Sequence, residues 1–341
     1  MTAAVSEFDA DALASYLRTQ LPDLKGAMRL ERIGGGQSNP TFFVSFRQGP
    51  QLVLRKQPPG ELLKSAHAVD REFRILRALA STEVPVPPAL FYCEEREVIG
   101  TPFYVMERLQ GRVLSNYALP EIAPRERRAY LVALAETLAR LHAVDWSAAG
   151  LADYGRPGNF FTRQIARWTR QWQDSKGAEN ADIDRLIDWL PAHIPAGDET
   201  TIAHGDYRLG NVMFHPTEPR IVAVLDWELS TLGHPLADAA YSSLPWLTEP
   251  DVFEGVRGLD LAVMQIPGQQ EYLDVYLQSS GRAAAVQPFH HAFSLFRFAV
   301  ILEGISARVR AGNAAGENAA EVGNLSARFA RYAADIIATE G

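Results

Sequence analysis

The sequence predicts an α+β protein with a small N-terminal lobe built on an antiparallel sheet and a larger, mainly helical C-terminal lobe. The chain has 341 residues, which is enough for two lobes that each bury a core. Strand-like segments gather in the first 108 residues, whereas apolar residues at helical spacing dominate the rest. We therefore expect an N-terminal lobe over residues 1–108 and a C-terminal lobe over residues 109–341.

A helix and two strands are expected at the start of the N-terminal lobe. Apolar residues at helical spacing predict a short amphipathic helix over residues 8–20. Residues 41–46 and 51–55 are rich in β-branched, aromatic and aliphatic types, and a Gln-Gly-Pro turn at 48–50 joins them, so they predict two strands. Three consecutive glycines precede the first of these strands, at Gly34, Gly35 and Gly36.

A helix and one more strand complete the expected N-terminal lobe. The helical period is clear over residues 68–79. Prolines at 85, 87 and 88 are expected to end this helix and open a linker. Residues 103–107, which read Phe-Tyr-Val-Met-Glu, predict a strand that closes the lobe.

The C-terminal lobe is expected to be mostly helical. Pro124 suits the first turn of a helix. Apolar periodicity predicts helices over 125–142, 161–173, 182–190, 270–279, 289–310 and 319–338. Between them, residues 211–214 and 221–225 predict a short hairpin.

Composition limits the class of protein. The chain is 47% hydrophobic and 22% charged, as in an ordinary soluble enzyme, and its net charge of −8 argues against a general nucleic-acid binder. No uncharged run approaches the ~20 residues of a membrane helix, and no signal peptide is recognisable at the start. The single cysteine, Cys93, cannot form an internal disulfide. We expect a cytoplasmic protein without membrane or nucleic-acid partners.

The most informative segment is residues 204–211, His-Gly-Asp-Tyr-Arg-Leu-Gly-Asn, followed by a strand-like run that ends at Asp226. Asp206 could accept the proton of an alcohol, and Asn211 and Asp226 could hold a divalent ion at a phosphate. Phosphoryl transfer needs this combination of a base and oxygen ligands. The pattern therefore predicts a kinase, although spacing alone also allows a structural turn.

The N-terminal lobe offers the remaining parts of such a site. Arg55, at the end of the second strand, could meet nucleotide phosphates, and Glu72 on the following helix could pair with it. Lys56 is the alternative cation, and because side chains alternate along a strand, only one of the two can face a cleft. Gly34, Gly35 and Gly36 could close over the nucleotide. They are neither a P-loop nor a dinucleotide fingerprint, and a flexible turn is the alternative interpretation.

These residues resemble the aminoglycoside phosphotransferase and choline-kinase-like family, relatives of the protein kinases. The resemblance extends over roughly residues 28–335, with His-Gly-Asp at 204–206 matching the catalytic loop of the family and Leu-Asp-Trp-Glu at 225–228 its metal-binding segment. It implies a bilobal, protein-kinase-like fold that uses ATP and Mg²⁺. It further implies Asp206 as base and Asn211 and Asp226 as metal ligands. Glu107 and Leu109 fall where backbone groups would cradle adenine.

Within that family, the sequence most resembles the kinase-like domain found beside, or fused to, acyl-CoA dehydrogenases. Residues 54–60 and 163–168 carry this resemblance. It implies a hydroxy acid or hydroxyacyl-CoA as phosphate acceptor and a functional link to an acyl-CoA dehydrogenase. One departure is Arg55, where many members have lysine. Arginine also pairs with phosphate, so activity is still expected, but with different geometry.

A basic stripe bears on the acceptor. Arg163, Arg167 and Arg170 would share one side of the helix near residue 165, with Trp168 beside them. This stripe favours an anionic acceptor over a polycationic aminoglycoside, and we place Glu228 in the same acceptor site. The alternative is a solvated face of arginines over aromatic core residues.

The leading hypothesis is an ATP- and Mg²⁺-dependent kinase that phosphorylates a hydroxyl of a small metabolite. Two alternatives remain open: an aminoglycoside phosphotransferase, and a pseudokinase that binds nucleotide without transfer. The acceptor, the choice between ATP and GTP and the oligomeric state are not encoded in any motif that we recognise.

Overall fold

The computed structural model describes residues 7–34, 39–60, 68–310 and 325–340. The chain divides into two compact units. The N-terminal unit comprises residues 1–111 together with 222–228, and the C-terminal unit comprises residues 112–221 and 229–341. The segment 222–228 thus joins the N-terminal unit although it follows more than a hundred residues of the other one. A backbone hydrogen bond from Val224 N to Pro85 O, 2.7 Å long, ties it there.

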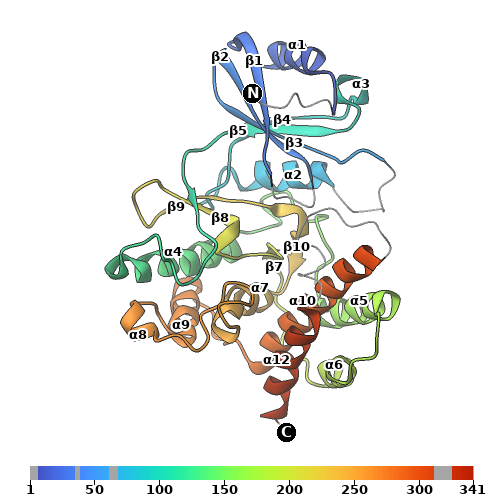
Figure 1. Ribbon diagram of the computed structural model, residues 1–341, viewed down its shortest axis with the longest axis vertical. Coiled ribbons are helices and arrows are strands. Elements are labelled where there is room, and N and C mark those ends of the chain that lie inside the picture. The colour runs from blue at the N-terminus through green and yellow to red at the C-terminus, as the bar shows by residue number, and fades with distance from the viewer. Residues whose placement is uncertain (1–6, 35–38, 61–67, 311–324, 341) are drawn as a thin grey trace. The chain divides into compact units, whose positions relative to one another are not determined.

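The N-terminal unit is built on a five-stranded antiparallel sheet (Figure 1), in which the strands lie in the order β1-β2-β3-β5-β4. The strands are β1 (Lys25–Arg32), β2 (Thr41–Gln48), β3 (Leu52–Lys56), β4 (Ala89–Cys93) and β5 (Phe103–Glu107). Its helices are α1 (Ala10–Gln20), α2 (Val69–Leu79) and the single turn α3 (Arg96–Ile99). The strands and helices expected around 8–20, 41–55, 68–79 and 103–107 are therefore present.

The two faces of this sheet pack on different helices. On one face, Leu17 of α1 packs into a buried cluster with Leu54 of β3 and its cross-strand partner Val105 of β5. The other face packs on α2, where the ring of Phe73 lies 6.2 Å from that of Tyr104. Because neighbouring residues of a strand point to opposite faces, residues 55 and 104 belong to the α2 side.

Two strands of this sheet were not predicted. Strand β1 carries Lys25, Arg29, Glu31 and Arg32 and lies at the edge of the sheet, where charged residues are common and apolar alternation is weak. Strand β4 begins directly after the prolines at 85–88. The linker expected there is present as the irregular segment 80–88, but it is short and leads into the opposite edge of the sheet.

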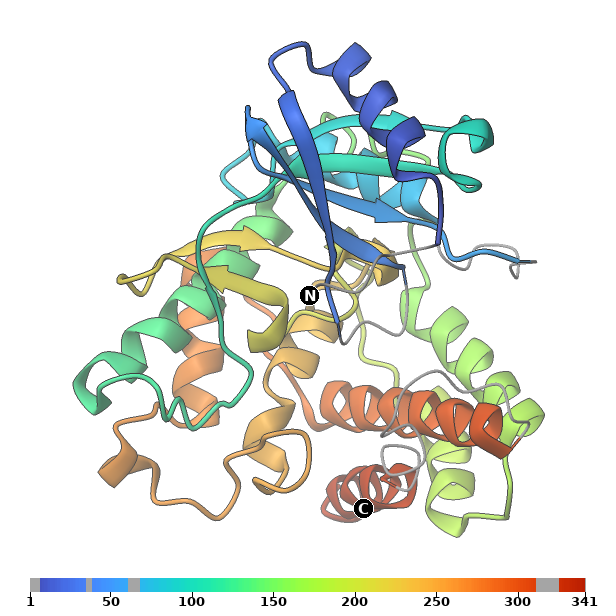
Figure 2. The same cartoon turned by 45° about the horizontal axis from the view of Figure 1, so that its top comes forward.

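The C-terminal unit consists mainly of helices. They are α4 (Pro124–Ala143), α5 (Phe160–Ser175), α6 (Ala181–Ala192), α7 (Pro235–Ser242), α8 (Leu261–Met264), α9 (Gln269–Ser280), α10 (Pro288–Arg310) and α12 (Ser326–Ala338). Helix α10 contacts α5, α6, α7 and α12 (Figures 1 and 2). It is apolar on most sides, as expected of a helix surrounded by others. The last helix was predicted over 319–338; it is seen from residue 326, and residues 319–324 lie outside the described residues.

Short strands and turns hold the loops of this unit. Strands β7 (Thr201–Ala203) and β10 (Thr231–Gly233) pair antiparallel, as do β6 (Arg112–Val113) and β8 (Val212–Phe214). The 3₁₀ turns Leu209–Asn211 and Leu244–Leu247 also lie in this unit, whereas strand β9 (Ile221–Val224) and the 3₁₀ turn Trp227–Leu229 fall mostly in the segment 222–228 of the N-terminal unit. No described helix is long and apolar enough to cross a membrane.

Buried histidines are a notable feature of the C-terminal core. Burial lowers the pKa of His142 and of His234 below the usual value. Burial also lowers the pKa of His290, to about 3, with the neighbouring His234 and His291 acting in the same direction. His290 is 1% exposed, and its Nδ1 accepts a hydrogen bond from Gln287 N at 2.9 Å. These side chains therefore stay neutral in the folded protein at neutral pH.

We expect acid to destabilise this core in part through His290. The folded pKa of about 3 lies below the ordinary 6.5, so the unfolded chain binds the extra proton and stability falls as the pH drops below about 6.5. Between pH 7.5 and 5.0, His290 should account for a loss of about 2 kcal/mol in unfolding free energy. Urea titrations of the wild type and His290→Asn at both pH values measure this loss, which the variant should lack; an equal drop in both proteins would contradict it.

Candidate active site

The loop from His204 to Asn211 holds the predicted base. Strand β7 leads into this loop and the 3₁₀ turn Leu209–Asn211 ends it. The side-chain amide of Asn211 donates to Oδ2 of Asp206 at 2.7 Å and to the main-chain oxygen of Asp206 at 2.8 Å. The side chain of Asp206 remains 22% exposed, so an acceptor molecule can reach it. The structure therefore brings Asp206 and Asn211 together.

Asp238 fixes the backbone of this loop. Its carboxylate is buried on α7 and accepts hydrogen bonds from the main-chain N of His204 at 2.6 Å and of Gly205 at 3.0 Å. Burial alone would raise the pKa of Asp238, but hydrogen bonds from His142 and from the loop outweigh it and lower the pKa. The residue thus remains a carboxylate. It lies in the first turn of α7, which His234 caps.

Gly205 and His204 complete the shape of the loop. Gly205 has a φ of +83°, and a Cβ there would lie 2.6 Å from the carbonyl oxygen of Leu229, so no other residue fits without a shift. The Nδ1 atom of His204 accepts a hydrogen bond from the main-chain N of Asp206 at 3.2 Å. His204 therefore orients the loop.

The side chain of Asn211 offers an oxygen atom that suits magnesium. Because its amide nitrogen donates to Asp206, its Oδ1 points away from that residue and is the atom that a metal would use. Among the described residues, no three His, Cys, Asp or Glu side chains form a metal cluster. Magnesium, however, binds through one or two carboxylates or amides, with water and substrate phosphates supplying the remaining oxygens. Asn211 and Asp226 fit this requirement by chemistry.

In the N-terminal unit, the guanidinium group of Arg55 contacts three carboxylates. Its Nη2 lies 2.7 Å from Oδ1 of Asp226 and 3.5 Å from Oε2 of Glu228, and its Nε lies 2.8 Å from Oε2 of Glu72. The Nε contact is an ion pair without hydrogen-bond alignment. The expected pairing of Arg55 with Glu72 is present, and the structure adds Asp226 and Glu228 to it.

Glu72 is the buried anchor of this cluster. It is 1% exposed and also accepts hydrogen bonds from Asn39 Nδ2 at 2.5 Å and from the hydroxyl of Tyr104 at 3.1 Å. Burial raises the pKa of Glu72, and Arg55 with these two donors lowers it in part. The side chain of Arg55 is therefore held in one orientation from α2. Sequence reasoning missed Asn39 and Tyr104, which lie in no recognisable motif.

Lys56 points to the opposite face of β3. Its side chain is buried, and its Nζ lies 5.6 Å from the centre of the Phe8 ring. Burial lowers the pKa of Lys56. Arg55, and not Lys56, is thus the cation on the side of Glu72 and Asp226.

Asp226 has an unusual backbone. It follows β9 with a φ of +61°, a region that costs free energy for residues other than glycine, although aspartate tolerates it better than most. Such strain commonly marks functional positions. The side chain is 34% exposed, so one carboxylate oxygen faces Arg55 while the residue stays accessible.

The predicted nucleotide-binding backbone is only partly described. Gly34 is exposed, and no atom would lie within 4 Å of a Cβ there, whereas Gly35 and Gly36 lie outside the described residues. The main-chain N of Glu107 donates to Pro88 O at 2.9 Å and is already used. Leu109 follows just after β5, and among the described residues no hydrogen bond involves its backbone.

The predicted acceptor residues of α5 differ in exposure. Arg167 is exposed, and Arg163 is partly exposed and donates to the main-chain oxygen of Arg156 at 2.5 Å. Trp168 is 6% exposed and belongs to the hydrophobic core, so only its edge is available to a ligand. Two guanidinium groups cover the indole, with Cζ of Arg167 5.0 Å and Cζ of Arg297 5.6 Å from the ring centre. Sequence reasoning missed Arg297.

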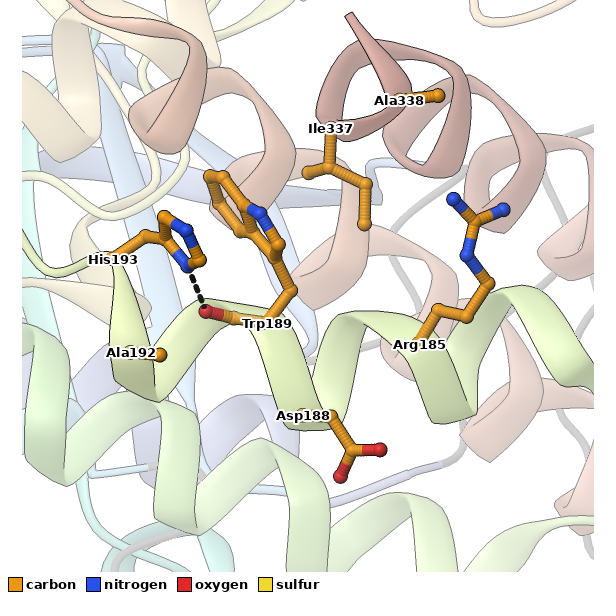
Figure 3. A pocket seen from close by; sticks show the side chains of 7 residues that line it. All are labelled: Arg185, Asp188, Trp189, Ala192, His193, Ile337 and Ala338. Carbon is orange, nitrogen blue, oxygen red and sulfur yellow. Dashed lines mark hydrogen bonds between the residues drawn. The ribbon is translucent and has the colours of Figure 1, made fainter. Parts of the chain in front are cut away.

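A groove elsewhere in the C-terminal unit contains none of the predicted site residues. It has a volume of about 580 Å³ and lies between α6 and the end of α12, as Figure 3 shows. Trp189 and His193 stack within it, with ring centres 4.0 Å apart. The remaining lining residues are Arg185, Asp188, Ala192, Ile337 and Ala338.

Comparison with known proteins identifies the family. Residues 29–257 match the family described as the phosphotransferase enzyme family. The chain belongs to the phosphotransferase enzyme family. It is therefore an enzyme that transfers a phosphoryl group to an alcohol, and the α+β, kinase-like fold expected from the sequence is confirmed.

Relatives of this phosphotransferase extend the comparison. A Ralstonia eutropha protein, provisionally named an aminoglycoside phosphotransferase, is 43% identical, with a TM-score of 0.88 over 97% of this chain and 99% of its own. The mouse acyl-CoA dehydrogenase family member 10 is 42% identical over 97% of the phosphotransferase but 31% of its own length. The phosphotransferase spans less than half the length of the curated relatives it matches.

A more distant structure shares the fold alone. A thermostable variant of the aminoglycoside phosphotransferase APH(4)-Ia, solved with AMP-PNP and hygromycin B, is 18% identical and has a TM-score of 0.63 over 95% of this phosphotransferase and 99% of its own chain. The predicted roles of individual residues of the present chain rest on its own geometry.

Proposed function

We propose that this phosphotransferase is an ATP- and Mg²⁺-dependent kinase whose acceptor is a small hydroxylated metabolite with an anionic group, either a hydroxy acid or a hydroxyacyl-CoA. The observation that carries the proposal is the Asp206 carboxylate, which is accessible and held by Asn211 on a loop that Asp238 locks. A base in a fixed position beside an oxygen-donor amide suits transfer from a nucleotide to an alcohol.

In the proposed reaction, Asp206 accepts the proton of the acceptor hydroxyl. The acceptor oxygen forms a bond to the γ-phosphorus of ATP while the bond from that phosphorus to the bridging oxygen breaks, which releases ADP. Asn211 and Asp226 would hold magnesium, which when bound neutralises charge on the phosphates. Arg55, oriented by Glu72, would meet the phosphates, and Gly34, Glu107 and Leu109 would contribute backbone groups to the nucleotide site.

The preference for an anionic acceptor rests on Arg167 and Arg297. Both guanidinium groups lie over the indole of Trp168, and neither has an ion-pair partner among the described residues. Two cations without acidic partners favour a carboxylate or phosphate and repel a polycationic aminoglycoside. Arg163 and Glu228 are further candidates for contacts with the uncharged groups of the same acceptor.

We further propose a link to acyl-CoA dehydrogenation. The mouse relative that carries this segment is named an acyl-CoA dehydrogenase family member. A phosphorylated hydroxy acid or its CoA ester would connect the phosphoryl transfer with the dehydrogenation as a shared intermediate.

A labelled transfer assay tests the proposed function. The purified protein is incubated with γ-labelled ATP and panels of hydroxy acids, hydroxyacyl-CoAs, amino alcohols and aminoglycosides, with and without Mg²⁺. We expect a labelled product from a hydroxy acid or hydroxyacyl-CoA, and only with Mg²⁺. Preferential phosphorylation of an aminoglycoside, or no transfer to any acceptor, would contradict the proposal.

We expect Arg167→Gln to weaken acceptor binding. Because a hydrogen bond to a charged group contributes about 1.5–3 kcal/mol, KM for the anionic acceptor should rise roughly tenfold or more while KM for ATP is unchanged. Arg125→Gln is the matched control, since Arg125 is exposed on α4, a helix that carries none of the predicted acceptor residues. Steady-state kinetics with the best acceptor of the panel measures both, and equal effects in the two variants would remove Arg167 from the acceptor site.

A further inference from the structure

Both oxygens of the Asp206 carboxylate are engaged. Asn211 donates to Oδ2 at 2.7 Å, and the hydroxyl of Tyr241 donates to Oδ1. Arg208 adds a weaker contact, with its Nε 3.5 Å from Oδ1. Two donors from different elements, the 3₁₀ turn and α7, thus fix the plane of the carboxylate.

Tyr241 is itself held rigidly. It is 4% exposed, and its ring lies 6.1 Å from that of Phe298 and 6.4 Å from that of Phe253. Burial, together with the neighbouring Asp206 carboxylate, raises the pKa of Tyr241 well above its usual value. Its hydroxyl therefore keeps its proton at working pH and acts as a donor to Asp206.

Arg297 connects Tyr241 to the backbone of the loop. Its Cζ lies 5.5 Å from the centre of the Tyr241 ring, and its Nη2 donates to the main-chain oxygen of Gly205 at 2.6 Å. The ring of Tyr241 and the peptide that precedes Asp206 therefore share one guanidinium group. Movement of the Tyr241 ring away from Asp206 would disturb this contact.

We propose that Tyr241 is a positioning residue for phosphoryl transfer, holding Asp206 in the rotamer in which the carboxylate meets the acceptor hydroxyl. This inference rests on the proposed role of Asp206 as base. Tyr241 exchanges no proton itself: the proton of the acceptor passes to Asp206, and the phenol O–H bond stays intact. Because small displacements of a reacting group cost large factors in rate, loss of this single hydroxyl should lower turnover.

Tyr241→Phe tests the proposal, since it removes the hydroxyl and keeps the ring. We expect kcat for labelled transfer from ATP to fall about 10- to 100-fold, with KM for ATP and nucleotide binding by calorimetry unchanged. Tyr154→Phe is the matched control, because Tyr154 is equally buried and its hydroxyl lies 2.6 Å from that of Ser230. Its kcat should stay within about twofold of wild type at a comparable loss in melting temperature.

A double-mutant cycle separates positioning from a general structural role. If Tyr241 acts through the carboxylate, Tyr241→Phe should cost less than about twofold in an Asp206→Asn background. The same fold loss in both backgrounds, or a Tyr241→Phe loss no larger than that of Tyr154→Phe, would overturn the inference. A wild-type protein that transfers no phosphate would instead overturn the proposed function, so the two failures are distinguishable.

Discussion

Asp206→Asn is expected to lower turnover by about 10²- to 10⁴-fold, which is the usual contribution of a general base. The substitution preserves the size of the side chain but removes the group that accepts the proton. Nucleotide binding should remain, because Asp206 lies on a loop whose shape is set by Asp238 and Gly205. Single-turnover transfer from labelled ATP to the best acceptor measures the loss.

Calorimetry with ATP and Mg²⁺ is the control for Asp206→Asn. Binding within a few-fold of wild type, combined with a slow chemical step, would assign the effect to chemistry and not to folding. Turnover near that of the wild type would remove Asp206 from the mechanism.

Asp226→Ala is expected to abolish the magnesium dependence of nucleotide binding. Loss of even an outer partner of a metal ligand commonly costs 10- to 100-fold in metal affinity, and loss of a ligand should cost at least as much. The cluster around Arg55 should survive, since Glu72 and Glu228 still contact that side chain. Calorimetric titrations with ATP are compared with and without Mg²⁺ in both proteins.

Two comparisons make this experiment specific. In the wild type, Mg²⁺ should strengthen ATP binding, whereas in Asp226→Ala the two titrations should coincide. Glu218→Ala is a suitable control, because Glu218 is an exposed acidic residue in the C-terminal unit that forms ion pairs with His215 and Arg220. A magnesium effect retained in Asp226→Ala would show that Asp226 is not a ligand.

Local patterns predicted the parts of the site that a short segment encodes. Asp206 and Asn211 lie five positions apart in one loop, and this spacing predicts the contact that the structure shows. The opposite orientations of Arg55 and Lys56 follow from strand alternation, and the structure decides which side Glu72 occupies.

What the sequence could not reveal depends on packing between distant segments. Tyr241 and Arg297 reach the loop of residues 204–211 from α7 and α10, and no local spacing marks either of them. Asp238 lies on α7, far along the chain from the loop whose backbone its carboxylate holds. Strand β1 was missed because an edge strand needs no apolar alternation when charged residues face the solvent.

We propose that Asn211 and Asp226 hold one magnesium ion at the phosphates of ATP. A crystal structure of the protein with AMP-PNP and Mg²⁺ tests it most directly. We predict one ion bound by Oδ1 of Asn211 and a carboxylate oxygen of Asp226. The carboxylate of Asp206 should be free to contact an acceptor hydroxyl beside the γ-phosphate. A nucleotide bound with its metal away from both side chains, or with Asp226 still paired only to Arg55, would contradict the account.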